Sequence, residues 1–414
     1  MEAPYSYKSL GTSNSRRRRR ARQRRLDQVT LLVGLVEQGE PFEQDYLERY
    51  ARLFNDGSVA EPMLFWGASE SWWPWIRQFR RRLSSVDRVV VALAREEASL
   101  GRLAALVVLA RFFGKPVALW YRNPCFETSL ESGGRWLRHM VRLATMVVCP
   151  DRHAQQWLQH FGIRAHIVSD FVPGSKREAE PVSRLQPRIL ASGPISRRGD
   201  FGGLVKAFEL VKGKYPRAEL TIVGDGPLSG QMSSWQSSYN GNSYSGYDSR
   251  NGPNGHNGLS AGIAVVMQPD LQALEQLVAG CDLYVCSATQ TLRPIGLLRA
   301  MAAGRPVVST DAGSVRTLID KDRHGLLVPI NQPAMLAEAI IRLIESPEET
   351  SRLASAARQR VAGFTLSHAR ATWTRAWESA LGADQGQSRV TAEQPVDAAA
   401  VAGRERATQT LPVG

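Results

Sequence analysis

The sequence has little cysteine and no long hydrophobic run. Its 414 residues contain no C-x-x-C pair and no cysteine with a histidine at metal-ligand spacing. The longest apolar run, residues 103–114, includes an arginine and is too short to cross the ~30 Å hydrocarbon core of a membrane. These absences argue against a disulfide scaffold, a zinc site and a membrane-spanning segment. We expect reduced thiols in core positions at the four cysteines, Cys125, Cys149, Cys281 and Cys286.

The N-terminus also lacks the apolar core of a secretory signal, because Glu37 and Gln38 interrupt the apolar residues that follow its charges. We therefore expect a cytoplasmic protein. The net charge is +13, but eight arginines stand in residues 15–25, which leaves 13 − 8 = +5 for the rest of the chain. Residues 1–26 have no apolar periodicity, and their composition predicts a disordered basic tail.

Three roles for this arginine run stay open. Residues 16–25 could hold the protein at an anionic membrane surface, which would make it peripheral at the inner face of the membrane. The run could equally be a solvated tail without a partner. Nucleic-acid binding ranks third, because no recognised nucleic-acid module accompanies the run, so we expect no specific nucleic-acid partner.

Short apolar runs alternate with helical segments through residues 27–180. The runs VTLLVGLV, PMLFWG, RVVVAL and KPVALWY are rich in Val and Leu, and segments of helical character such as SLGRLAALVVLARFF lie between them. Continuous apolar strands that alternate with helices are typical of a parallel sheet covered on both faces. The pattern predicts a doubly wound α/β domain.

A second series of the same kind follows a weakly patterned linker at residues 173–187. It begins with the strand RILASG, passes through ELTIVGDG and DLYVCSA, and ends with the helix AMLAEAIIRLIES. Two such sheets face each other across a cleft between the carboxyl ends of their strands, where ligands bind in open α/β sheets. Residues 229–260, dense in Ser, Gly, Asn and Tyr, predict a disordered insertion, with a polar-aromatic binding segment as the alternative. Residues 383–414 predict a disordered tail.

Two turns at strand ends of the second half have the chemistry of a ligand site. ASGPISRRGD follows the first strand, and its Gly193 allows close backbone approach while Arg197 and Arg198 supply fixed positive charge that suits a diphosphate. VGDGPL follows the second strand and places Gly224 beside Asp225 in a tight turn. The second signal is weak by itself, because Gly-Asp-Gly is an ordinary turn.

A third turn joins the strand DLYVCSA to TLRPIGLLRAMAAGRPVVST. Its Pro294 suits the first turn of a helix that runs to Ala303. The N–H groups of Ile295, Gly296 and Leu297 would then point into the cleft, where the positive end of the helix dipole favours a phosphate. A plain strand-to-helix junction has the same spacing, so both interpretations stay open.

The second half resembles the donor-binding domain of the retaining glycosyltransferases of family 4 (glycosyl transferases group 1), which have the two-domain GT-B fold. The resemblance rests on residues 188–228 and 281–340, above all on AMAAGRPVVSTDAGS followed by HGLLVP. It implies two doubly wound Rossmann-like domains that face a cleft. These are an acceptor-side domain at 27–180, a nucleotide-sugar donor domain at 186–363 and a crossover helix at 364–382.

The resemblance implies transfer of a sugar from a nucleotide-diphosphate donor to a hydroxyl of a glycan or lipid-linked acceptor, with retention at the anomeric carbon. It implies polysaccharide or glycoconjugate biosynthesis and neither a metal nor another cofactor. Cations and a helix N-terminus would neutralise the leaving diphosphate. Arg198 stands where the family has a lysine for this role, with Arg197 beside it, and Arg293 precedes the proline as in one subgroup of the family.

The chain departs from the family at the acids. The family's two glutamates, with seven residues between them, fall on Thr291 and Arg299. The first normally faces the donor sugar and the second accepts hydrogen bonds from ribose hydroxyls. Thr291 can donate or accept one bond, whereas Arg299 can accept none and would offer a cation to a phosphate. The family's histidine near the acceptor aligns with Arg122, which Asn123 follows.

Three other patterns carry weaker signals. The D-K-D at residues 320–322 has the form of a metal-binding D-x-D, but its place in a loop favours a solvated acid pair. Glu96 and Glu97 follow a strand, where they suit either a general base or the acidic first turn of a helix. The aromatic cluster SWWPW at 71–75 suits packing, or contact with sugar or lipid.

Two hypotheses from different classes therefore remain. One is a GT-B glycosyltransferase, and the other is a non-catalytic GT-B-like binding or scaffold protein that has lost the acids. An NAD-dependent oxidoreductase is disfavoured, because no G-x-G-x-x-G follows the first strand of either half.

Overall fold

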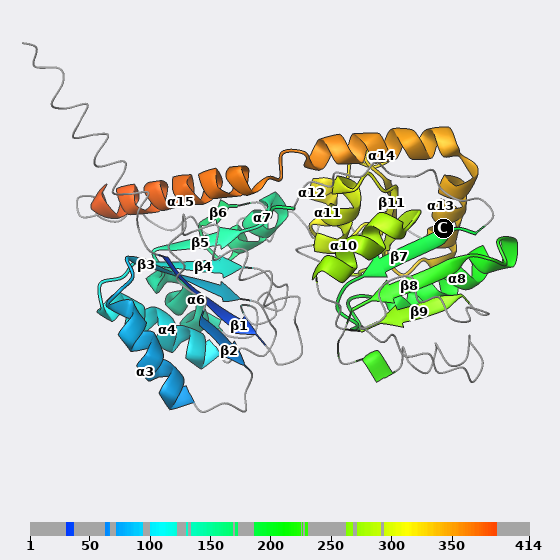
Figure 1. The fold of residues 1–414 in the computed structure, drawn as a ribbon. Coiled ribbons are helices and arrows are strands. Elements are labelled where there is room, and N and C mark those ends of the chain that lie inside the picture. The colour runs from blue at the N-terminus through cyan, green and yellow to red at the C-terminus, as the bar shows by residue number, and fades with distance from the viewer. Residues whose placement is uncertain are drawn as a thin grey trace, which may run out of the picture.

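The computed structural model of the protein has two α/β domains that lie side by side (Figure 1). Helix α14 (Pro347–Val361) runs along the C-terminal domain, and α15 (Leu366–Gly386) runs along the same side of the N-terminal domain. The structure describes residues 30–36, 63–66, 72–93, 100–121, 130, 134–168, 170–172, 186–224, 226, 228–230, 262–267, 271–290 and 294–386.

The N-terminal domain has a six-stranded sheet in the order β2-β1-β3-β4-β5-β6, in which all strands are parallel. The strands are the continuous apolar runs that the sequence predicts, because both faces of the sheet are covered. The strands are β1 (Thr30–Val36), β2 (Met63–Trp66), β3 (Arg88–Leu93), β4 (Val117–Tyr121), β5 (Met146–Cys149) and β6 (Ala165–Ile167).

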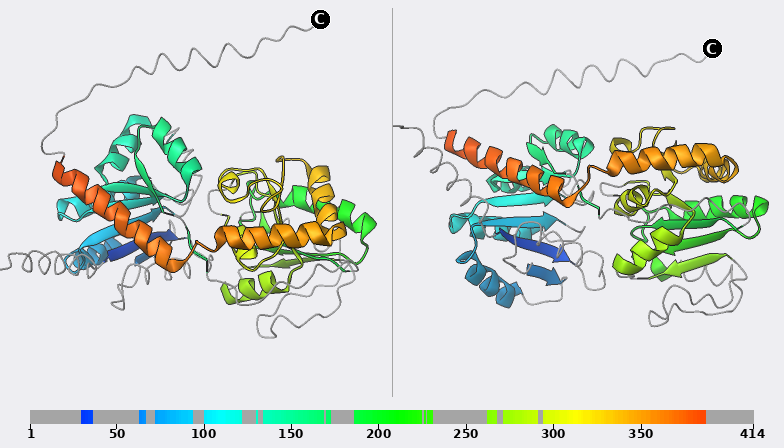
Figure 2. Two further views of the ribbon diagram at one scale, coloured as in Figure 1. Left: turned by 90° about the horizontal axis from the view of Figure 1, so that it is seen from above. Right: turned by 45° about the horizontal axis from the view of Figure 1, so that its top comes forward.

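Alternate strand residues face opposite sides of this sheet. Leu31 and Val89 belong to the cluster packed against α3, α4, α6 and α7, whereas Leu32 and Val90 belong to the cluster packed against α15. Figure 2 shows α15 lying across that second face. The helices are α3 (Trp72–Leu83), α4 (Leu100–Phe112), α6 (Gly134–Leu143), α7 (Arg152–His160) and α15 (Leu366–Gly386).

The C-terminal domain repeats this architecture with the strand order β12-β11-β10-β7-β8-β9, again all parallel. The short strand β9 was not predicted from the sequence, since its four residues directly follow the Ser- and Gly-rich segment. The strands are β7 (Arg188–Ser192), β8 (Glu219–Val223), β9 (Ile263–Val266), β10 (Leu283–Cys286), β11 (Val307–Thr310) and β12 (Leu326–Val328).

Helices cover both faces of the second sheet. Leu204 of α8 and Ile340 of α13 share one buried cluster, and Leu274 of α10, Leu297 of α11 and Ala357 of α14 share the other. The sequence pattern did not predict α14, whose residues are mostly polar. The helices are α8 (Phe201–Lys214), α10 (Leu271–Gly280), α11 (Ile295–Ala302), α12 (Val315–Leu318), α13 (Pro333–Glu345) and α14 (Pro347–Val361).

The predicted fold class is confirmed, since both halves are doubly wound parallel α/β domains. The predicted domain limits stay predictions, because the tails, residues 173–185 and residues 231–261 lie outside the described part of the chain. Among the described helices, none combines the length and hydropathy needed to cross a membrane. Three predicted core thiols, Cys149, Cys281 and Cys286, are free and buried, and burial raises the pKa of Cys149 and of Cys281 to about 12.

Candidate functional site

Three turns of the C-terminal domain meet at the carboxyl edge of its sheet. The strands β7, β8 and β10 end there because the sheet is parallel. The N–H of Gly193 donates to the carbonyl of Val223 (3.0 Å), and the N–H of Gly224 donates to the carbonyl of Val266 (3.1 Å). The turns after β7 and β8 therefore continue the ladder of the sheet. The structure brings together the turns that the sequence singled out as a ligand site.

The arginine turn after β7 is held by the segment after β10. The carbonyl of Arg198 accepts a hydrogen bond from the N–H of Thr289 (2.8 Å), and the carbonyl of Gly199 accepts one from the Ser287 hydroxyl (2.7 Å). Arg198 is half-buried and Arg197 is exposed. These bonds fix the backbone of the turn, so both arginines start from a fixed position at this edge.

Gly224 is required by contact between two of these turns. A Cβ atom at this position would overlap the carbonyl oxygen of Gly193, so any larger residue would push the turns after β7 and β8 apart. The sequence predicted that these glycines let the backbone approach a ligand, and the close approach seen at Gly224 is between two backbone turns. The site owes its shape to this packing.

Helix α11 begins at the same edge and presents free N–H groups. Pro294 precedes it and provides no side-chain cap, and the Pro294 carbonyl already accepts the N–H of Leu298 (2.9 Å). The N–H groups of Ile295, Gly296 and Leu297 have no acceptor within the helix, because the first turn of any α-helix lacks them. These groups and the helix dipole create a site of positive potential.

Two hydroxyl groups, those of the buried Tyr284 and the partly buried Ser192, support the start of α11, and the sequence analysis did not identify them. Ser192 Oγ and Tyr284 Oη lie 2.9 Å apart, and a Cβ on Gly296 would overlap both. Tyr284 Oη also donates to the carbonyl of Ser192 (3.2 Å), and burial raises the pKa of Tyr284. The only signal in the sequence was a tyrosine in the otherwise aliphatic strand LYVC.

Arg299 lies one turn further along α11 and is directed at the neighbouring helix. Its side chain is only 6% exposed, and its Nη1 donates to Oε1 of Glu275 on α10 at 3.0 Å. The Glu275 side chain is 43% exposed. The Arg299 guanidinium is thus engaged by a carboxylate that the sequence analysis did not identify. Its predicted role toward a ligand stays a prediction.

The N-terminal domain faces this edge with the carboxyl ends of its own strands. Ile295 packs against the cluster formed by the N-terminal sheet and α15, and the Val172 N–H donates to the Phe364 carbonyl (3.0 Å). Asp151, the N-cap of α7, lies against the hydroxyl of Ser314 in the C-terminal domain. Burial raises the pKa of the Asp151 carboxyl, and the Ser314 hydroxyl opposes that shift. The start of α11 therefore lies at the junction of the domains.

Several predicted site residues lie outside the described part of the chain, and their roles stay predictions. On the donor side these are Asp225, Thr291 and Arg293, and on the acceptor side Arg122 and Asn123. The pair Glu96 and Glu97 also lies outside it.

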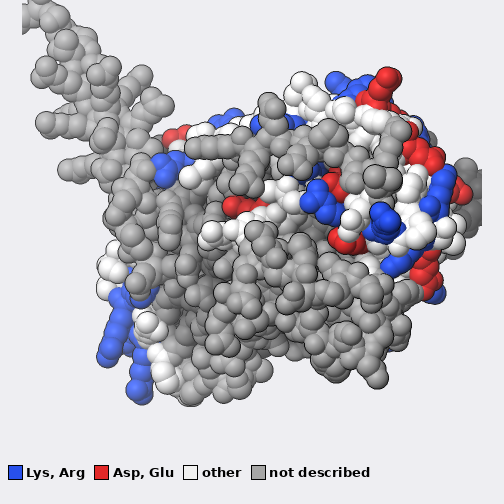
Figure 3. All heavy atoms as spheres, turned by 45° about the vertical axis from the view of Figure 1, so that its right-hand side comes forward, with Lys and Arg blue, Asp and Glu red and all other residues white. Residues whose placement is uncertain are grey.

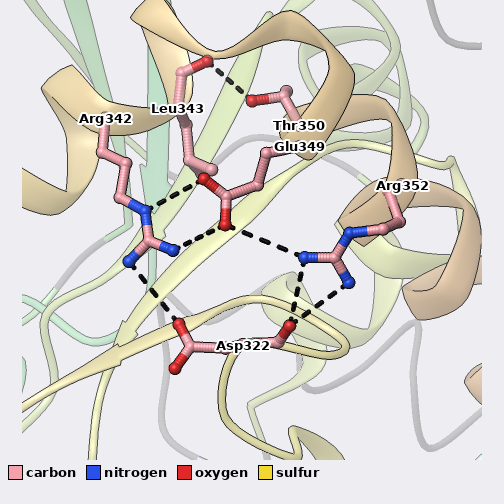
Figure 4. Close-up of polar contacts among 6 residues, drawn as sticks. All are labelled: Asp322, Arg342, Leu343, Glu349, Thr350 and Arg352. Carbon is pink, nitrogen blue, oxygen red and sulfur yellow. Dashed lines mark hydrogen bonds and ion pairs between the residues drawn. The ribbon is translucent and has the colours of Figure 1, made fainter.

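The D-K-D segment takes part in an ion-pair network away from these turns (Figure 4). Asp322 Oδ1 lies 3.6 Å from Nη1 of Arg342, and Arg342 in turn donates two hydrogen bonds to Glu349 (2.6 and 2.9 Å). Arg352 donates to the Asp322 carbonyl and lies 3.8 Å from Glu349. Within the described residues, no group of three or more His, Cys, Asp or Glu side chains is placed to hold a metal ion.

Comparison with known proteins finds a protein family that resembles the C-terminal domain. Residues 186–346 match the family described as Glycosyl transferases group 1. A D-inositol 3-phosphate glycosyltransferase of Frankia alni is 43% identical over 70 residues, which are 17% of this chain and 17% of that protein. The matched segment is therefore a small part of that relative's length.

The likeness of fold extends over most of the chain. Anabaena Alr3699/HepE, solved in complex with UDP and glucose, aligns with a TM-score of 0.62 and 15% identity. The alignment covers 84% of this chain and 99% of its own. Sucrose-phosphate synthase from Thermosynechococcus elongatus aligns with a TM-score of 0.59 and 13% identity, over 86% of this chain and 100% of its own. The chain has the GT-B fold of these glycosyltransferases.

Proposed function

We propose that this protein, which has the GT-B fold and matches the glycosyl transferases group 1 family over residues 186–346, is a retaining glycosyltransferase. It transfers a sugar from a nucleotide-diphosphate donor to a hydroxyl of a glycan or lipid-linked acceptor. The observation that carries this proposal is the meeting of three turns at the carboxyl edge of the C-terminal sheet. They are the arginine turn at 193–200, the turn that begins at Gly224 and the start of α11.

The proposed chemistry is neutralisation of a leaving diphosphate. As the bond to the anomeric carbon breaks, negative charge develops on the phosphates. The half-buried Arg198 and the N–H groups at the start of α11 offset that charge without a proton transfer. The acceptor approaches from the N-terminal domain, which lies against Ile295. Relatives of the same fold were solved with UDP and glucose, so UDP-sugars are the first donors to test.

Glu275 is the residue that we expect to replace the acid missing at Arg299. A ribose needs an acceptor of hydrogen bonds, and an arginine offers only donors. Arg299 holds Glu275 in a fixed position, and the Glu275 side chain remains 43% exposed. On this proposal a carboxylate on α10 does the work of the one expected on α11, since it lies beside the same helical turn.

The function is tested by incubating the full-length protein with UDP-glucose, UDP-N-acetylglucosamine and the corresponding ADP- and GDP-sugars, with both binding and release of free nucleotide measured. We expect one donor to bind and turn over, and Arg198→Ala to abolish both. The matched control is Arg217→Ala, an exposed arginine at the opposite edge of the same sheet. Absence of binding to every donor would contradict the proposal.

The role of Glu275 is tested by comparing UDP with 2′-deoxy-UDP. The wild type should prefer UDP, and Glu275→Gln should lose that preference while still binding both nucleotides. Equal preferences in the two proteins would exclude contact between Glu275 and the ribose.

The second candidate is a GT-B-like binding protein without turnover. The replacement of the family's acid by Arg299, and the engagement of its guanidinium by Glu275, favour it. Tight donor binding with no nucleotide release, in the presence of an acceptor extract, would support this candidate over the enzyme.

A further inference from the structure

Three helices on the outer face of the N-terminal domain carry only basic charge. Helix α3 contains four arginines, α4 two and α6 three, and none of the three contains an aspartate or a glutamate. Figure 3 shows blue side chains beside uncharged ones at its lower left, without red beside them, whereas blue and red alternate over the described part at the upper right. A helix layer in a small domain would normally mix both signs. The helices themselves have no acid, and the exposed Asp87 lies in the turn after α3, so positive charge is in excess on this layer and favours an anionic partner.

The carboxyl ends of two of these helices are fixed beside each other. Helices α4 and α6 pack together. Nη1 of Arg111, at the end of α4, donates to Oγ1 of Thr145 (3.2 Å) in the turn after α6, and the same oxygen accepts the N–H of Val117 (2.9 Å). The turn after α4 is closed by a bond from the N–H of Lys115 to the carbonyl of Ala110 (2.9 Å). These bonds hold the carboxyl ends of α4 and α6 next to each other.

Large apolar side chains project into solvent from the carboxyl ends of α4 and α6. Phe112 is 83% exposed, Phe113 42% and Leu143 44%. The two phenylalanine rings meet edge to face, with centroids 5.7 Å apart. We call these three residues the apolar ridge. Exposed arginines lie at the same ends of the three helices: Arg80 and Arg81 on α3, Arg111 on α4 and Arg142 on α6.

We propose that the apolar ridge and its surrounding arginines dock the protein on an anionic lipid bilayer. Phenylalanine and leucine side chains enter the boundary between headgroups and acyl chains, and arginines bind the anionic headgroups around them. A nucleic acid is a poorer match, because aliphatic Leu143 offers no face on which a base could stack and it forms part of the same ridge.

This surface lies at the amino edge of the parallel sheet, where α3, α4 and α6 end. The turns of the candidate site lie at carboxyl edges instead. Docking therefore leaves the junction of the domains open to a donor and to an acceptor. The proposal rests on the surface itself, so it stands or falls independently of the glycosyltransferase activity.

The test is co-sedimentation of the full-length protein with vesicles of phosphatidylcholine alone and of phosphatidylcholine with phosphatidylglycerol. We expect binding only to the anionic vesicles. The triple variant Arg80→Glu, Arg81→Glu, Arg111→Glu should lower the partition coefficient by about 100-fold, at roughly five-fold for each basic residue near the surface. Phe112→Ser should lower it by about five-fold, and its exposed position leaves the fold intact.

The matched control reverses three exposed charges of the C-terminal domain, Lys206→Glu, Arg217→Glu and Arg323→Glu, and should bind like the wild type. A chain without residues 1–25 should keep its dependence on Phe112. Equal binding by the triple variant, complete loss on removal of residues 1–25, or no binding of the wild type would each overturn the proposal. So would an oligonucleotide that binds through the same arginines while the vesicles do not.

Discussion

The two domains have the same architecture but differ in how their basic side chains are accompanied by acids. Each has six parallel strands with helices on both faces. In the C-terminal domain, basic side chains meet acids, as in the pairs of Arg188 with the buried Asp282 (2.8 Å) and of Arg342 with Glu349 (2.6 Å). In the N-terminal domain, the helices α3, α4 and α6 have arginines without any acid.

This difference follows from where each domain makes its contacts. On our first proposal, a donor binds to backbone turns and a helix start, which need glycine and proline at fixed positions and tolerate a neutralised surface around them. On our second, the N-terminal domain binds the anions of a membrane with its outer helices. The two proposed roles therefore use different parts of the same architecture.

The largest expected effect concerns how the N-terminal domain is held together. Trp373 of α15 is 2% exposed and packs edge to face on Trp120 of β4, with centroids 5.7 Å apart. We expect Trp373→Ala to lower the free energy of unfolding by about 3–5 kcal/mol. Hydrogen exchange should show the loss in the N-terminal sheet and leave β7 and β10 protected.

The control for this variant is Trp73→Ala, since Trp73 is 71% exposed and should change the free energy of unfolding by less than about 0.5 kcal/mol. Equal loss of protection in both domains would mean that α15 holds the two together as one unit.

The next effect concerns the start of α11. Gly296→Ala places a methyl group against the Ser192 and Tyr284 hydroxyls. We expect a loss of about 1–3 kcal/mol in the free energy of unfolding, from overpacking, together with loss of donor binding. Both are measured by denaturant unfolding and calorimetry. Gly213→Ala in α8, where an added Cβ meets nothing, should leave binding unchanged, and a parallel loss there would contradict the explanation.

A charge exchange tests the pair between α10 and α11. Arg299→Glu sets two carboxylates against each other and should cost about 1–3 kcal/mol, reduced from the value for a fully buried pair because Glu275 is partly exposed. Adding Glu275→Arg should recover most of the loss, as judged by a double-mutant cycle. Additive effects of the two substitutions would show that the pair contributes nothing.

The smallest effect concerns the ion pairs of Figure 4. Hydrogen bonds from Arg342 lower the pKa of Glu349. Because the pKa is lower in the folded state than in the unfolded state, the ionised carboxylate stabilises the fold. This stabilisation is complete above the ordinary pKa of glutamate and is lost as the pH falls through the folded-state pKa. Glu349→Gln should therefore cost less than about 1 kcal/mol at pH 7, since the Arg342 side chain is 50% exposed and water screens the pair. The difference from wild type should vanish in unfolding experiments at acid pH, and a constant difference would point to another cause.

The local pattern of apolar residues was enough to predict most of the strands of both sheets. Strands buried on both faces must be continuous apolar runs, so β1, β4, β7 and β10 were visible without a structure. Gly224 and Pro294 were visible as turn and helix-start residues, and the part they take in a ligand site stays a prediction.

The tertiary structure alone decided which side chains meet. The bond between Arg299 and Glu275 joins residues 24 positions apart, and the contact of Ser192 with Tyr284 spans 92. No local period encodes such pairs, because they depend on how neighbouring strands and helices are packed. The apolar ridge is of the same kind, since a phenylalanine at the end of a helix is buried or exposed according to what the rest of the fold places over it.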